Sequence, residues 1–132
     1  MNLEILKIAS HTENHKVLAD CTHKSKLKNP LCGDEMQISL KIVKNEIVDF
    51  GYQCKSCIYC QASASVLSRV SVKKSINDVV EIINLVDTFS DKNKLKFPIG
   101  WKDLKTLFSK NNLSRKECIL LPFKTLSKAL KF

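Results

Sequence analysis

The stretch EMQISLKIVKNEIVDFGYQ, residues 35–53, decides the fold of this chain. In its first half, apolar side chains alternate with polar ones, at Met36, Ile38, Leu40 and Ile42. A period of two residues is typical of a strand with one buried face. Lys44-Asn45-Glu46 suits a turn, and residues 47–52 are again rich in residues that favour strands. The stretch therefore predicts an antiparallel hairpin over residues 35–53.

Helices are expected on the C-terminal side of this hairpin. Residues 58–72 are rich in alanine and serine, which permit close helix packing. Ser75 is a good N-cap for a helix that carries apolar residues as far as Val86. Further helices are predicted over residues 101–110 and 114–131. The order of elements indicates an α+β fold, with strands first and helices after.

Three other segments complete the prediction. Residues 3–12 predict a short amphipathic helix, residues 13–31 are polar and expected to be irregular, and residues 89–100 are expected to form a loop. The ring of Pro122 would clash with the carbonyl of Cys118 inside one continuous helix. We therefore expect Pro122 in the first turn of the last helix, with Cys118 in the lead-in.

The composition is that of a globular protein. The 132 residues are 44% hydrophobic, and we expect them to form a single domain, residues 1–132. No apolar run is long enough to span a bilayer, so no membrane partner is expected. The N-terminus has no hydrophobic signal region and carries Glu4 and Glu13, which predicts a cytoplasmic protein.

The net charge of +9 raises the question of a nucleic-acid partner. Eight lysines and arginines lie in residues 101–132, against only Asp103 and Glu117. The few aromatic residues in this segment do not form an RNA-binding signature. We therefore interpret the charge as a solvated lysine-rich surface and expect no nucleic-acid partner.

The cysteines point to a metal. There are six, at positions 21, 32, 54, 57, 60 and 118. In a reducing compartment, cysteines are more often metal-binding or catalytic than disulfide-bonded. Thiolates bind zinc and iron–sulfur clusters far better than they bind hard ions.

Three of these cysteines and one carboxylate are candidates for a shared metal site. In an extended segment, Cys32 and Asp34 point the same way, and Gly33 lets the backbone turn. Cys57 lies where strand gives way to helix, and Cys118 precedes the last helix; a helix N-terminus favours a thiolate. A single cysteine is usually a small buried hydrophobe. Three at element boundaries favour convergence of Cys32, Asp34, Cys57 and Cys118.

Cys54-x-x-Cys57-x-x-Cys60 has the spacing of the first part of a bacterial ferredoxin motif. Its fourth cysteine is missing, because Gln61-Ala62-Ser63-Ala64 follows, so a ferredoxin is not expected. Cys54 and Cys60 are spare thiols beside the site or alternative ligands. No Ser/His/Asp or Cys/His pair at motif spacing supports hydrolase chemistry.

Three motifs resemble the U-type iron–sulfur cluster assembly scaffolds, the IscU/NifU-like family, and are most similar to its SufU branch. They are Asn29-Pro30-Leu31-Cys32-Gly33-Asp34, Cys57 followed by Ala62-Ser63-Ala64-Ser65, and Arg115-x-x-Cys118-x-x-Leu121. The resemblance covers roughly residues 4–131. The long stretch between Cys57 and Cys118 is similar to an insertion of the SufU branch. Ser56, where the family usually has glycine, and the extra thiols Cys54 and Cys60 are departures.

The resemblance implies a small antiparallel sheet, usually of three strands, packed by helices. It implies that Cys32, Asp34, Cys57 and Cys118 hold zinc or a nascent [2Fe–2S] cluster, and that Cys32 receives sulfur from a cysteine desulfurase. The partners implied are that desulfurase and recipient apoproteins or cluster carriers; a homodimer is left open. The chain is then a scaffold and sulfur carrier rather than an enzyme.

Two alternatives remain beside this reading. One is a zinc-dependent sulfurtransferase that activates a cysteine desulfurase without building clusters. The other is a zinc-stabilised nucleic-acid-binding module, which the charge of +9 motivates.

Overall fold

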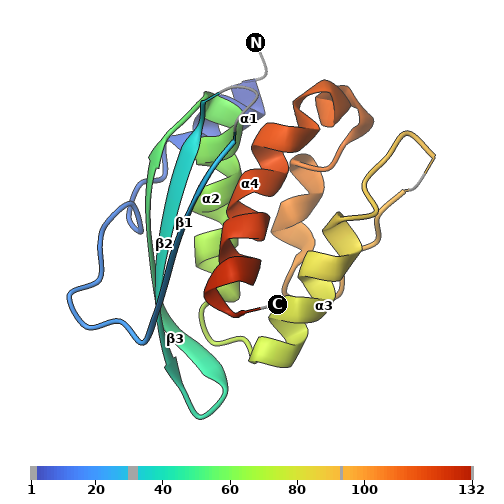
Figure 1. Ribbon diagram of the computed structural model, residues 1–132. Coiled ribbons are helices and arrows are strands. Elements are labelled where there is room, and N and C mark those ends of the chain that lie inside the picture. Colours follow the sequence, from blue (N-terminus) through green and yellow to red (C-terminus); the bar gives the residue numbers. More distant parts are fainter. Residues whose placement is uncertain (1–2, 30–32, 93, 132) are drawn as a thin grey trace.

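The chain folds into a three-stranded antiparallel sheet with its helices packed on one face (Figure 1). The computed structural model describes residues 3–29, 33–92 and 94–131. The strands are β1 (His23–Lys28), β2 (Glu35–Val43) and β3 (Glu46–Lys55), in the order β1-β2-β3. The α-helices are α1 (Leu3–Ala9), α2 (Ile58–Ser71), α3 (Ile76–Val86) and α4 (Lys116–Ala129). The predicted α+β class is confirmed.

The hairpin of β2 and β3 forms as predicted. Ile38 pairs with Tyr52 and Leu40 with Phe50, so the buried side chains of both strands share one face. The turn between the strands contains Lys44 and Asn45, whose φ angles are 51° and 65°. Two consecutive positive φ angles give the twist that a tight hairpin turn requires.

The expectation that residues 13–31 are irregular was wrong for His23–Lys28, which form strand β1. It pairs with β2 along its whole length, from His23 opposite Leu40 to Lys28 opposite Glu35. Leu27 is its only strongly apolar residue, and Ser25 is held by a hydrogen bond from its hydroxyl to the carbonyl of Thr125 at 2.6 Å. The hydrophobic alternation was therefore too weak to detect, because the edge of this sheet is built with exposed lysines.

Helices α2 and α3 match their predictions, and the Ser75 hydroxyl accepts a hydrogen bond from the Asp78 N–H at 3.1 Å, as an N-cap should. The helix predicted over residues 101–110 is instead a short 3₁₀ helix, η1 (Lys102–Thr106), and a second 3₁₀ helix, η2 (Lys110–Arg115), precedes α4. The buried Asn112 amide donates hydrogen bonds to the carbonyls of Thr106 and Leu107, both at 3.1 Å. These bonds satisfy carbonyls that a longer helix would have used.

Pro122 lies inside α4 rather than in its first turn, so this prediction was wrong. The helix begins at Lys116 and Cys118 is already helical. Pro122 has no N–H to donate, and its ring disturbs the preceding turn. The Ser63 hydroxyl of α2 donates to the carbonyl of Ile119 in that turn at 2.6 Å. The packing of α4 against α2 thus accompanies a proline that an isolated helix would exclude.

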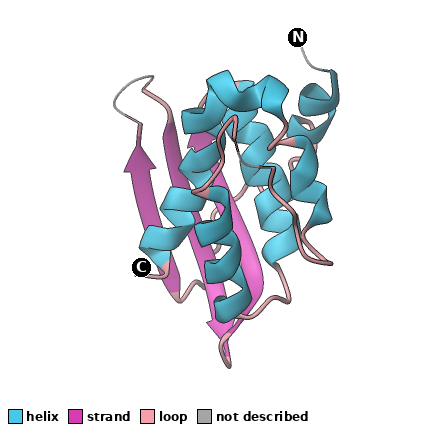
Figure 2. Cartoon of the chain, turned by 90° about the vertical axis from the view of Figure 1, so that its right-hand side faces the viewer, coloured by secondary structure: helices cyan, strands magenta, loops and turns pink. Residues whose placement is uncertain are grey.

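The core lies between the sheet and the helical layer, which stands in front of the strands in Figure 2. Phe50 and Phe123 are fully buried there. The opposite face of the sheet is partly covered by the segment after α1, where a Cβ on Gly51 would approach the Lys16 carbonyl to 2.6 Å. Within the described ranges, every helix is too short or too polar to cross a bilayer.

Candidate metal centre

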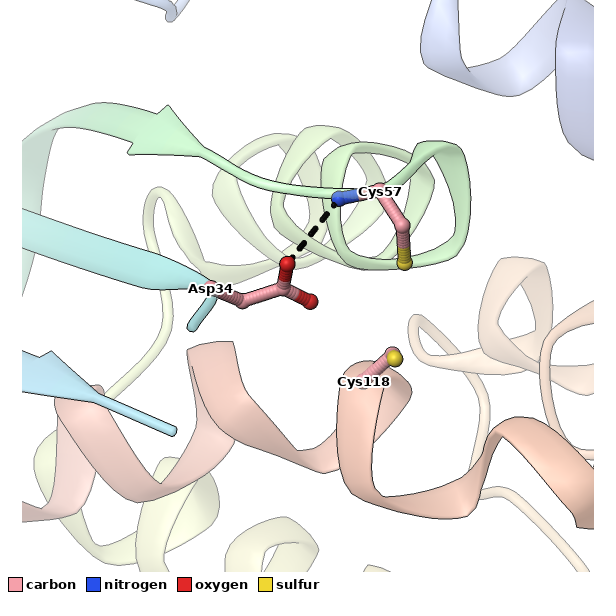
Figure 3. Close-up of side chains that lie close together, drawn as sticks. All are labelled: Asp34, Cys57 and Cys118. Carbon is pink, nitrogen blue, oxygen red and sulfur yellow. Dashed lines mark hydrogen bonds between the residues drawn. The ribbon is translucent and has the colours of Figure 1, made fainter. Parts of the chain in front are cut away.

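Asp34, Cys57 and Cys118 converge at one end of the molecule. Their carboxylate oxygen and sulfur atoms lie within 4.8 Å of one another. Asp34 immediately precedes β2, Cys57 is the N-cap of α2, and Cys118 is in the first turn of α4 (Figure 3). Three separate elements therefore supply the three groups.

Backbone hydrogen bonds with Asn29 hold Gly33 and Asp34 beside the end of β1. Gly33 has a φ of +75°, which glycine adopts at little cost, and its N–H donates to the Asn29 carbonyl at 2.8 Å. The Asn29 N–H donates in return to the Asp34 carbonyl at 2.7 Å. The carboxylate is buried, and its Oδ1 accepts a hydrogen bond from the Cys57 N–H at 3.3 Å.

The second carboxylate oxygen of Asp34 is the strongest sign of a ligand. Oδ2 is buried and has no hydrogen-bond partner among the described residues. Burying a carboxylate oxygen without a partner is costly, and such atoms in native structures usually contact an ion or water. Oδ2 lies beside the sulfur atoms of Cys57 and Cys118 (Figure 3), where a cation would satisfy it.

Both cysteines lie at helix N-termini. The Cys57 backbone is extended, with φ −68° and ψ 165°, and its side chain makes no capping hydrogen bond. Cys118 is the third residue of α4 and is 8% exposed. The helix dipole favours negatively charged groups at such positions. The two helices thus present two thiol side chains in favourable fields.

Two contacts hold α2 and α4 in register at this end. Ser63 is completely buried and donates to the Ile119 carbonyl. The Arg115 guanidinium lies 5.3 Å from the centroid of the Tyr59 ring. Arg115 and Ser63 stand in the sequence motifs named above, but neither they nor Tyr59 were singled out for these contacts. No local pattern marks them, because each contact joins segments distant in the sequence.

The other predicted ligands differ in position. Cys32 lies outside the described residues. Cys54 and Cys60 are not part of the group within 4.8 Å. Burial raises the pKa of the Cys60 thiol far above its ordinary value, although a hydrogen bond with Ser56 opposes this shift. Burial likewise raises the pKa of Cys54. Burial therefore disfavours the thiolate form of both side chains relative to an exposed cysteine.

The donor set fits a soft or borderline metal. Zinc in proteins is bound by cysteine, histidine and carboxylate ligands in tetrahedral geometry. Iron–sulfur clusters are held mainly by thiolates. Two cysteines and one aspartate supply three such donors, and the unpartnered Oδ2 of Asp34 is oriented as a ligand atom would be. Hard cations such as magnesium prefer sites built from oxygen alone.

Comparison with known proteins independently identifies the family of this chain. The family model "NifU-like N terminal domain" matches residues 2–98. An iron–sulfur cluster assembly scaffold protein IscU of Thermotoga maritima is 30% identical over 132 aligned residues, which cover 96% of this chain and 89% of that protein. A protein of the same name from Streptococcus pyogenes serotype M1 is 26% identical, with 98% and 84% covered.

Solved structures share the fold. The N-terminal part of a NifU-like protein from Brucella abortus matches with a TM-score of 0.88 at 22% identity, covering 98% of this chain and 91% of that one. A protein from Fervidobacterium islandicum AW-1, described as an iron–sulfur cluster assembly scaffold for the SUF system, also gives 0.88, at 23% identity, with 98% and 96% covered. At this level of identity the likeness concerns the architecture of sheet and helices.

Proposed function

Because the chain belongs to the NifU-like N-terminal domain family, we propose that it is a scaffold on which iron–sulfur clusters are assembled. One structural observation carries the proposal: the donor atoms of Asp34, Cys57 and Cys118 lie within 4.8 Å, and a buried carboxylate oxygen among them has no hydrogen-bond partner in the part of the chain that the structure describes. The curated relatives with the IscU name support the same role.

The ligand set of the proposal is Cys32, Asp34, Cys57 and Cys118, holding a resident zinc ion or the nascent [2Fe–2S] cluster that is the cargo. Cys32 is separated from Asp34 by one residue in the sequence. Asp34 supplies the harder donor, and a carboxylate is a weaker ligand for a soft metal than a thiolate. A mixed ligand set suits a site that must release what it holds.

Sulfur enters through Cys32 in this proposal, from the cysteine persulfide of a desulfurase. The Cys32 thiolate attacks the outer sulfur of that persulfide. A new S–S bond forms on Cys32 while the S–S bond of the desulfurase breaks, and the desulfurase cysteine leaves as a thiolate. No external oxidant or reductant is needed for this exchange. Recipient apoproteins or cluster carriers then accept the finished cluster.

A zinc-dependent sulfurtransferase is the second candidate, and the aspartate favours it. Carboxylate is an ordinary zinc ligand, whereas iron–sulfur clusters are most often held by cysteine alone. In this alternative the same residues hold zinc, and the sulfur received by Cys32 is passed on without cluster assembly. The two candidates share one site and differ in what the site retains.

Elemental analysis and anaerobic reconstitution test both candidates. The wild-type protein, Cys57→Ser and the control Cys21→Ser are purified without oxygen and assayed for zinc and iron. They are then incubated with ferrous iron, cysteine, a cysteine desulfurase and a thiol reductant, which supplies the electrons that reduce persulfide sulfur to sulfide. A [2Fe–2S] absorption spectrum in wild type and Cys21→Ser, but not in Cys57→Ser, supports the scaffold. Retained zinc with no cluster supports the sulfurtransferase. Metal binding that is equal in all three proteins contradicts both.

A further inference from the structure

A groove rimmed by lysines lies on the segment between α3 and α4. Two cavities of about 370 and 340 Å³ share Lys94, Leu95 and Lys105 among their lining residues. We call their combined lining the lysine-rimmed groove; its residues are Phe89, Lys94, Leu95, Lys96, Phe97, Lys102, Lys105, Phe108, Ser109 and Lys110. None of them belongs to the group formed by Asp34, Cys57 and Cys118.

The floor of the groove is apolar. Leu95 and Phe97 are half-buried, and Phe89 and Phe108 are buried beneath them. Phe108 contacts Phe89 edge-on at 5.1 Å between ring centroids, and Phe97 at 5.7 Å. This aromatic packing holds a firm hydrophobic surface beneath the cavities.

The charged side chains at the rim of the groove are all lysines, so the rim is positively charged. Lys94, Lys96, Lys102, Lys105 and Lys110 are all exposed. Neither cavity is lined by a carboxylate of the described residues, and none of the five lysines forms an ion pair within that part of the chain. Clustered charge of one sign without compensation raises the local concentration of oppositely charged ligands.

Part of the backbone along this groove, residues 94–97, has no hydrogen-bond partner among the described residues. Residues 94–97 belong to no helix or strand, and no hydrogen bond joins their N–H or C=O groups to another described residue. Their side chains alternate, with Lys94 and Lys96 exposed and Leu95 and Phe97 half-buried. That alternation is the pattern of a strand with one buried face. The segment therefore resembles a strand edge that has no neighbour.

We propose that the lysine-rimmed groove binds an acidic peptide segment of a partner protein, which lies beside residues 94–97 as an added strand. Addition to a strand edge uses main-chain hydrogen bonds for affinity and pockets for alternate side chains. Apolar side chains of the peptide fill the two cavities, and its carboxylates face the five lysines. The groove precedes α4, so such a partner docks on the segment that leads to Cys118.

The floor argues for a peptide over a nucleic acid. Phe89 and Phe108 are 1% and 8% exposed, and Phe97 is half-buried and packs against Phe108, so the floor offers no fully exposed aromatic ring to a base. Single-stranded nucleic acids need exposed aromatic faces for stacking. Small alternating pockets beside an extended backbone match peptide side chains instead.

Fluorescence anisotropy with the labelled acidic peptide EDEFEVDED tests the proposal. Lys94→Glu/Lys105→Glu removes charge that both cavities share, and Lys24→Glu/Lys44→Glu is a control with the same change in net charge at exposed lysines elsewhere. We expect the groove variant to weaken binding roughly tenfold or more and the control to weaken it by less than about threefold. Added salt should weaken wild-type binding. Equal losses in both variants overturn the proposal.

Hydrogen exchange tests the strand addition in the wild-type protein. Saturating peptide should slow exchange of amides among Leu95, Lys96 and Phe97. Protection confined to other segments contradicts the docking geometry. Vesicles of phosphatidylserine and a single-stranded RNA are tested with the same variants. The peptide proposal is wrong if the peptide does not bind while the vesicles or the RNA bind to wild type and not to the groove variant. In that case the groove binds a membrane or a nucleic acid.

Discussion

The Ser63 hydroxyl donates a hydrogen bond to the Ile119 carbonyl at 2.6 Å and thereby ties α2 to α4. Cys57 caps the first of these helices and Cys118 lies in the first turn of the second. Both bonded residues are completely buried. The relative position of the two sulfur atoms therefore depends on a buried contact that neither cysteine makes itself.

Ser63→Ala should lower stability and loosen the candidate metal centre. It leaves the buried Ile119 carbonyl without its hydroxyl donor, which costs about 1–3 kcal/mol of unfolding free energy. Urea denaturation of the metal-free protein measures this cost, and chelator competition measures zinc affinity. Ser10→Ala is the control, because the Ser10 hydroxyl bonds locally to the Lys7 carbonyl at an exposed site. Equal stability of the two variants would show that the interhelical bond contributes nothing.

Asp34→Asn should weaken zinc binding while the fold persists. The amide oxygen can still accept from the Cys57 N–H, but the negative charge of the ligand is lost. Removing a metal ligand should lower zinc affinity at least as much as removing a residue that hydrogen-bonds to a ligand. We therefore expect a drop in zinc affinity of about tenfold or more. Competition with a chromophoric chelator measures it. Asp49→Asn is the control at a half-buried carboxylate; zinc affinity unchanged in both variants excludes Asp34 as a ligand.

Cys57→Ser and Cys60→Ala should separate a ligand from a core thiol. Cys60 is completely buried and burial raises its thiol pKa, so it behaves as a small hydrophobe. We expect Cys60→Ala to keep its zinc and to lose about 1 kcal/mol of stability from the small cavity. Cys57→Ser should lose the zinc. Metal analysis decides between them, and loss of zinc in Cys60→Ala would reinstate Cys60 as an alternative ligand.

Tyr52 should make stability depend on alkaline pH. Burial raises the pKa of its hydroxyl from the ordinary 10.0 to about 12, and the nearby Cys54 thiol adds to the shift. In the unfolded chain the proton leaves near the ordinary value, so between these two pKa values the unfolded state binds fewer protons than the native state. The unfolding free energy then falls as pH rises, by about 1.4 kcal/mol per pH unit for this group.

Two variants isolate this contribution. Tyr52→Phe should remove the tyrosinate absorbance step near pH 12. It should also remove the Tyr52 contribution to the fall in unfolding free energy between pH 10.0 and about 12. Tyr59→Phe should leave the step in place. Spectrophotometric titration and denaturation at several pH values provide the measurements. A step that survives in Tyr52→Phe would assign the high pKa to another group.

Local sequence patterns account for the hairpin and for α3. The alternation from Met36 to Ile42 and the N-cap at Ser75 act over a few residues. These local patterns therefore predict β2 and α3 directly. Strand β1 was missed because hydrogen bonding to β2 and the Ser25 contact stabilise it, rather than an apolar pattern of its own. The position of Pro122 was misjudged because packing against α2, rather than local propensity, stabilises α4 around the proline.

The sequence by itself determined the α+β class, the central hairpin and the residue types that suit a soft metal, because these depend on short-range periodicity and side-chain chemistry. Only the tertiary structure decided that Asp34, Cys57 and Cys118 lie within 4.8 Å, while Cys54 and Cys60 lie outside that group. The packing of α2 against α4 sets the positions of the two cysteines, and burial leaves one carboxylate oxygen of Asp34 without a hydrogen-bond partner among the residues that the structure describes. Convergence of residues far apart in the chain is a property of the packed core, which no local pattern encodes.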